Sequence, residues 1–129
     1  MPTLRRLVGV YDADHTIRGE LAYFVGARLG RAHCSLCDIT HGLLREKGEW
    51  QRCRDGLPIP FDTFHRDDQP DEVRGAAGGA APVVVAELDD GTWAVLLDGD
   101  RLEACDGSVD RLQEAVEAAI AEGGLAWPA

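Results

Sequence analysis

The sequence predicts a single α/β domain with a mixed sheet of about four strands and flanking helices, and with a Cys/His-bearing insertion after the first helix. Three observations support this fold class. The length of 129 residues suits one hydrophobic core. Short β-rich apolar runs alternate with segments whose apolar residues recur at helical spacing. The pair Asp90-Gly91 also separates two apolar runs, which is a strong short-range signal for a hairpin.

The first half of the chain predicts a strand, a helix and then the insertion. Residues 6–14, "RLVGVYDAD", form a short β-rich run that ends in aspartates, which indicates a buried strand. Residues 15–30 have apolar side chains at helical spacing and a glycine at the end, which indicates a helix. Residues 31–57 are polar and cysteine-bearing, and glycines interrupt their weak helical pattern. We therefore expect an insertion at 31–57 with little apolar burial of its own.

The second half predicts the remaining strands and two further helices. Residues 59–65 indicate a second strand, parallel to the first through the crossover between them. Residues 70–79 predict a short helix or a loop that opens at a proline. Residues 81–104 predict two antiparallel strands around the hairpin turn. Ser108 is placed to cap a closing amphipathic helix over residues 109–124.

This element order resembles that of thioredoxin-like proteins, and individual residues strengthen the resemblance. Tyr11, Asp12 and Asp14 in "YDAD" are similar to the "YDGDCxxC" opening of the DCC subgroup of thiol–disulfide oxidoreductases. Pro82, just before the run "VVVAEL", stands where thioredoxin-like proteins carry their cis-proline. The resemblance implies one thioredoxin-like domain over residues 1–129.

The chain departs from this subgroup at the position of its reactive cysteines. The family places them at the N-terminus of the first helix, where this chain has His15-Thr16-Ile17-Arg18. The resemblance therefore implies that the usual redox centre is lost, and that any disulfide reductase activity belongs to Cys34 and Cys37.

The segment "HCSLCDITHG" contains a candidate metal site. Cys34, Cys37 and His41 fall within roughly 60° of one another around a helix axis, so a helical segment would carry them on one face. Thiolate sulfur and imidazole nitrogen are the ligands that Zn²⁺ prefers, and a structural zinc stabilises a segment with little core of its own. His33, Cys53 or a water molecule is the expected fourth ligand.

The same segment admits two other interpretations. Cys34 and Cys37 form a Cys-x-x-Cys pair that suits thiol–disulfide exchange without any cofactor, and the preceding Arg31 would favour a thiolate. The cysteines can also be small buried residues in a packed turn.

A second candidate site follows from the predicted topology. His15, His65 and Pro82 are expected at one end of the sheet, where α/β proteins commonly bind ligands. The alternative is that these histidines are polar strand ends that face water. A helix of about 13 residues spans about 20 Å, so we expect the cysteine segment to lie far from this end.

Composition limits the partners. The chain carries 23 acidic and 13 basic residues, a net charge of −10, with no basic run longer than two residues, so we expect no nucleic-acid partner. The sequence shows no apolar stretch of membrane-spanning length and no signal-peptide core, so we expect a cytoplasmic protein without a membrane partner. Three function classes stay open: a zinc-binding protein, structural or catalytic; a dithiol oxidoreductase; and a non-catalytic scaffold for a protein or small-molecule partner.

Overall fold

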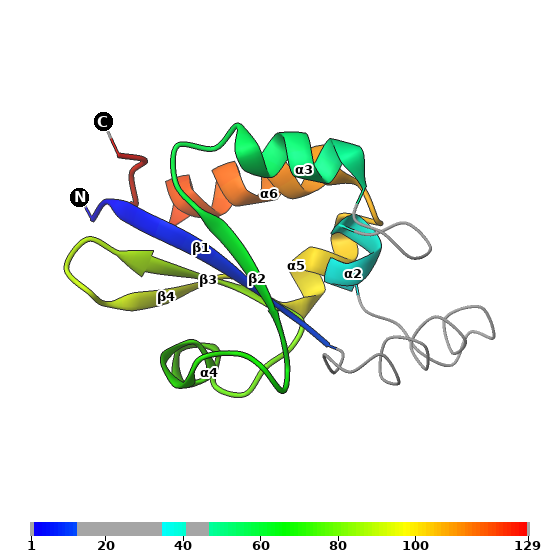
Figure 1. Ribbon diagram of the computed structural model, residues 1–129. Helices are drawn as coiled ribbons and strands as arrows, with labels where there is room; N and C mark the ends of the chain where they lie inside the picture. Colours follow the sequence, from blue (N-terminus) through cyan, green and yellow to red (C-terminus); the bar gives the residue numbers. More distant parts are fainter. Residues whose placement is uncertain (1, 13–34, 41–46, 129) are drawn as a thin grey trace.

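A computed structural model describes residues 2–12, 35–40 and 47–128 (Figure 1). The predicted helix at 15–30 lies outside these residues. Within them the strands are β1 (Leu4–Tyr11), β2 (Phe61–His65), β3 (Val83–Leu88) and β4 (Trp93–Leu97), and the helices are α2 (Ser35–Thr40), α3 (Gly48–Asp55), α4 (Asp71–Ala77), α5 (Gly99–Ala104) and α6 (Val109–Glu122). These elements form one small α/β domain.

The sheet is mixed and has the strand order β2-β1-β3-β4. β1 pairs in parallel with β2, with Leu7 opposite Phe61 and Tyr11 opposite His65. β1 also pairs antiparallel with β3, which continues into β4 through the predicted hairpin. The predicted four strands, the parallel pair and the hairpin are therefore confirmed.

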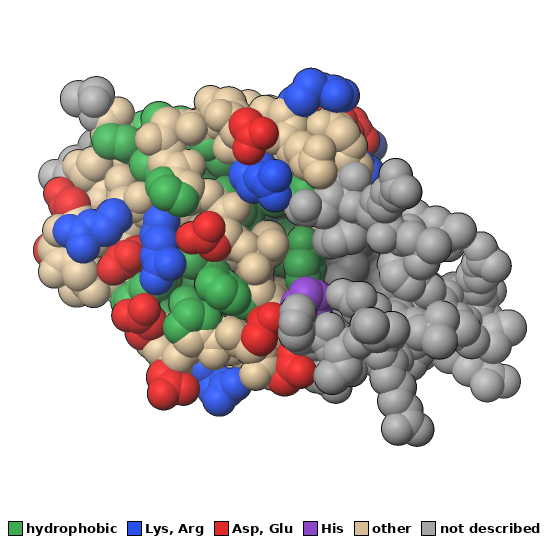
Figure 2. Space-filling model, viewed as in Figure 1, with side chains coloured by type: hydrophobic (Ala, Val, Ile, Leu, Met, Phe, Trp, Pro, Cys, Tyr) green, Lys and Arg blue, Asp and Glu red, His purple; other side chains and the backbone are tan. Residues whose placement is uncertain are grey.

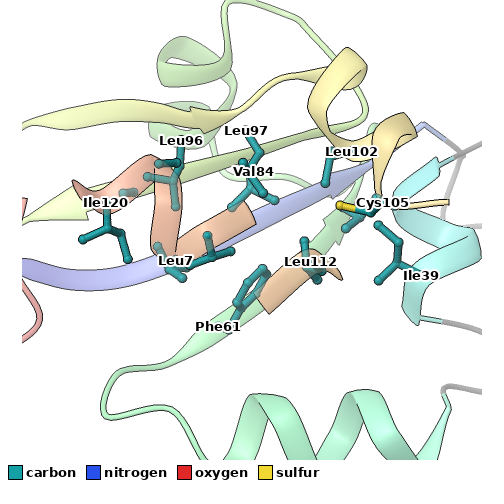
Figure 3. Packing of buried hydrophobic residues seen from close by; sticks show 14 of the residues in the cluster. Leu7, Ile39, Phe61, Val84, Leu96, Leu97, Leu102, Cys105, Leu112 and Ile120 are labelled. Atoms are coloured by element: carbon teal, nitrogen blue, oxygen red, sulfur yellow. The ribbon is translucent and has the colours of Figure 1, made fainter. Parts of the chain in front are cut away.

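The two faces of the sheet carry separate apolar clusters, because successive residues of a strand point to opposite faces. One face packs against α2, α3, α5 and α6, and in Figure 3 Leu7, Phe61 and Val84 point from the strands toward this helical layer. The other face packs against α4, which covers Val8, Val10, Val83 and Val85. Figure 1 accordingly shows α4 on the opposite side of the sheet from α3 and α6.

Three apolar side chains from the described parts of residues 31–57 belong to the main core, which is more apolar burial than the sequence predicted. The side chains of Leu36, Ile39 and Trp50 are fully buried. The reason is placement rather than number: positions 36 and 39 share one face of α2, and one large indole fills the space beneath α3. Gly9 on β1 permits α2 to approach the sheet closely, since a Cβ at position 9 would lie 3.0 Å from Cδ2 of Leu36.

Helix ends follow the local sequence signals. Ser108 caps α6 as predicted, accepting a hydrogen bond from the backbone N–H of Arg111. The segment at 70–79 contains the short helix α4, which ends at Gly78 with a positive φ of 63°. The interpretation of 81–104 as two strands missed α5. Asp98 caps that helix by accepting from the N–H of Arg101, and this capping signal was present in the sequence.

Candidate functional site at the carboxyl end of β1 and β2

Three strands bring a tyrosine, a histidine and a cis-proline to one end of the sheet. Tyr11 and His65 are opposite each other at the ends of β1 and β2. Val10 pairs with Val83, so Pro82 lies beside the same end of β1. The peptide bond between Ala81 and Pro82 is cis, the isomer that the resemblance implied. The predicted meeting of His65 and Pro82 is confirmed, while His15 lies outside the described residues.

α2 packs against this end of the sheet. The hydroxyl groups of Tyr11 and Thr40 share a hydrogen bond of 2.9 Å, and the Thr40 hydroxyl also donates to the carbonyl oxygen of Leu36. The expected distance between the cysteine segment and the histidine end is therefore wrong for the described part of that segment. The expectation relied on the length of the predicted helix at 15–30, which does not determine where the next element packs, and α2 packs at the end of β1.

A tight turn after β2 orients the His65 imidazole. One carboxylate oxygen of Asp68 accepts the backbone N–H of His65 at 2.6 Å, and the other lies 3.4 Å from Nδ1 of its ring. The ring also contacts Tyr11, with centroids 5.3 Å apart. The Asp68 carboxylate and the Tyr11 ring together fix the orientation of the imidazole. Sequence analysis missed Asp68, although its spacing of three residues from His65 suits such a turn.

Further polar contacts hold the turn and the end of β1 together. The Arg66 guanidinium lies 3.2 Å from the Asp12 carboxylate. The carbonyl oxygen of Arg66 accepts hydrogen bonds from the side chains of Gln69 and Arg74. The loop from 65 to 69 is thus tied both to β1 and to α4, which gives His65 a defined position.

The predicted metal ligands are placed only in part. Cys34, His33 and His41 lie outside the described residues; Cys37 lies on α2, but its side chain is outside them as well. Among the side chains that the structure describes, no three histidine, cysteine, aspartate or glutamate residues gather in a way that could hold a metal ion.

Cys53, the other candidate fourth ligand, faces α6. Its thiol donates to Oε1 of Gln113 at 3.9 Å and lies in a narrow apolar crevice of about 10 Å³ beside Trp50 and Trp127. Burial, and secondarily the negative charge of Asp110, raises the pKa of this thiol above its ordinary value. Both effects disfavour the thiolate that a metal or a redox reaction needs.

Cys105 is a core residue at the end of α5. Its side chain is 2% exposed, and its thiol donates to the carbonyl oxygen of Arg101. Figure 3 shows its sulfur among Ile39, Leu102 and Leu112. Burial raises the pKa of this thiol as well, although Arg111 opposes the shift. Cys53 and Cys105 are both free thiols.

Comparison of the chain with protein-family models, curated proteins and solved structures finds no match. In the part of the chain that the structure describes, no helix has the length and apolar character needed to cross a membrane. On the face drawn in Figure 2, basic side chains are interspersed with acidic ones.

Proposed function

We propose that this chain is a thioredoxin-like protein that binds one Zn²⁺ ion through Cys34, Cys37 and His41. The thioredoxin-like relationship draws support from the strand order β2-β1-β3-β4, from the parallel pairing of β1 with β2, and from α4, which among the described helices packs on the opposite face of the sheet from the others. The zinc assignment draws support from the donor set, since two thiols and an imidazole at this spacing suit a tetrahedral ion.

The observation that carries the proposal is the packing of α2 against the sheet. Leu36 and Ile39 are buried in the core, and the Thr40 hydroxyl is hydrogen-bonded to that of Tyr11. Apolar packing and a hydrogen bond therefore both hold the helix that contains Cys37 against the sheet. A fixed helix lowers the entropy cost of bringing ligands together, which is what a preorganised metal site requires.

The packing of α2 and α3 also changes the role that we expect for the ion. The sequence suggested that zinc would supply the stability that residues 31–57 lack, yet α2 and α3 bury their own apolar side chains. We therefore propose a local site that adds stability when loaded, in a domain that folds without metal. If water completes the coordination, the ion can act as a Lewis acid toward a bound substrate.

Zinc titration of the reduced, metal-free protein tests the proposal. Wild type is expected to bind one equivalent, and Cys34→Ser, Cys37→Ser and His41→Ala should each weaken the affinity by about tenfold or more, because each removes a ligand. Cys105→Ala is the matched cysteine control and should bind like wild type. Cys53→Ser identifies the fourth ligand: weaker binding assigns it to Cys53, and unchanged binding leaves His33 or water.

The alternative functions have distinct outcomes in the same experiment. A reduced wild type that binds no zinc overturns the proposal. Insulin reduction that Cys34→Ser abolishes would then establish dithiol chemistry, in which the two protein thiols become a disulfide and their two electrons and two protons reduce a substrate disulfide to two thiols. Absence of both activities would indicate the non-catalytic scaffold.

A further inference from the structure

β4 has an outer edge to which no other described strand pairs. The backbone N–H of Leu88 donates to the carbonyl oxygen of Thr92, so Thr92 directs its polar groups toward β3. In an antiparallel pair this orientation alternates along the strand. Ala94, opposite Ala86, therefore also faces β3, whereas Trp93 and Val95 direct their N–H and C=O groups toward the open edge.

The outward-facing residues present apolar side chains as well as polar backbone groups. Val95 is 53% exposed, which is more than any other large hydrophobic residue among those described. Trp93 lies two residues away on the same face of the sheet, half-buried beneath Arg6. The strand "WAVLL" contains no lysine or proline of the kind that proteins use to block edge pairing.

Both ends of this strand are acidic. Asp89 and Asp90 precede it in the hairpin, and Asp98 and Asp100 follow it. Hydrogen bonds from the side chain and backbone of Thr92 lower the pKa of Asp90, so its carboxylate is charged at neutral pH. An added strand would thus find apolar contacts along its middle and negative charge at each end.

These charges oppose pairing of β4 with a second copy of itself. In an antiparallel pair of two β4 strands, the start of one strand lies beside the end of the other, so the hairpin of one copy, with Asp89 and Asp90, would approach the start of α5 in the other copy, with Asp98 and Asp100. The two-fold symmetry repeats this approach at the other end of the pair. Like charges brought close together at both ends destabilise such a pair.

We propose that the outer edge of β4 binds an extended segment of a partner protein by strand addition, and that this segment has alternating apolar residues flanked by lysine or arginine at both ends. The backbone groups of Trp93 and Val95 supply the hydrogen bonds, the Val95 side chain supplies the apolar contact, and the flanking aspartates select positive charge.

The probe is a labelled synthetic peptide of alternating threonine and valine with two lysines at each end, and its counterpart carries glutamates instead. We expect the basic peptide to bind with an affinity that falls as salt rises, and to slow hydrogen exchange at the amides of Trp93 and Val95. The acidic peptide should bind at least about tenfold more weakly, because the aspartates repel it.

Two variants separate edge pairing from simple charge attraction. Val95→Pro removes an outward N–H without removing a bond to β3, and should weaken peptide binding by about tenfold. Val95→Lys keeps the N–H but places a positive charge at the edge, and should weaken binding by a similar factor even if the proline variant fails to fold. Asp100→Asn should weaken binding by about twofold or more, and its matched control on α6, Glu114→Gln, should not.

The proposal would be overturned by no binding of the basic peptide, by equal binding of the two peptides, or by wild-type affinity in folded Val95→Pro and Val95→Lys. Peptide binding without protection of the Trp93 and Val95 amides would also overturn it, because the peptide would then occupy another surface.

Discussion

Truncation of Trp50 tests whether α3 is part of the core in the absence of metal. The indole is the largest fully buried side chain described, and its ring meets that of Phe61 edge to face with centroids 4.9 Å apart. Loss of a buried tryptophan leaves a cavity, and such replacements by alanine cost about 3–5 kcal/mol. Trp50→Ala in metal-free protein is therefore expected to lower the free energy of unfolding by about 4 kcal/mol.

Urea denaturation followed by circular dichroism in the presence of a chelator provides the assay. With a slope of about 2 kcal/mol per molar urea, the expected loss moves the midpoint by about 2 M. Trp127→Ala is a matched control, since Trp127 lies partly exposed near the chain end and donates to Glu117, and it should cost about 1 kcal/mol. A shift below about 0.5 M for Trp50→Ala would mean that α3 is not packed on the sheet without metal.

Two further predictions concern the contact of α2 with the sheet and the buried thiols. Gly9→Ala should destabilise the protein by about 1–3 kcal/mol in thermal or urea unfolding, because the new Cβ would crowd Leu36, whereas Gly75→Ala in α4 meets no atom within 4 Å and should be neutral or slightly stabilising. Equal stability of the two variants would argue against the packing of α2 on β1 at Gly9. The pKa values of both described thiols are raised by burial, so the unfolded chain loses these protons first. Stability should therefore fall as pH rises above about 9, and the fall should be smaller in Cys53→Ser when urea midpoints at pH 8 and 10 are compared.

Much of the fold is predictable from local pattern. Short-range interactions specify a strand at "VVVAEL", a turn at Asp90-Gly91 and a helix start at Ser108. The structure contains all three. The capped helix α5 was missed because its six residues are too few to show a period. Its capping aspartate was the available signal.

The candidate site is less predictable, because its geometry depends on contacts between distant residues. Tyr11 and Thr40 are 29 positions apart, and no periodicity indicates that their hydroxyls meet. The expectation of two well-separated sites followed from helix length, a quantity that fixes distance along one element and not the path of the next. By contrast, the meeting of His65 and Pro82 was predictable, because strand pairing alone determines it.

The packing of α2 and α3 also determines how the proposed metal binding and the stability of the domain should be linked. In a domain whose metal site orders its own segment, most of the binding free energy is spent on folding, and the metal-free chain is unfolded. Here Leu36 and Trp50 are buried in the core, so we expect α2 and α3 to be ordered without an ion. If the proposed ligands bind zinc, their binding free energy should therefore show as affinity. The free energy of unfolding should then increase with zinc concentration as RT ln(1 + [Zn²⁺]/Kd), starting from a stable metal-free baseline. That baseline is the property that separates a site added to a folded domain from an ion that the domain needs in order to fold.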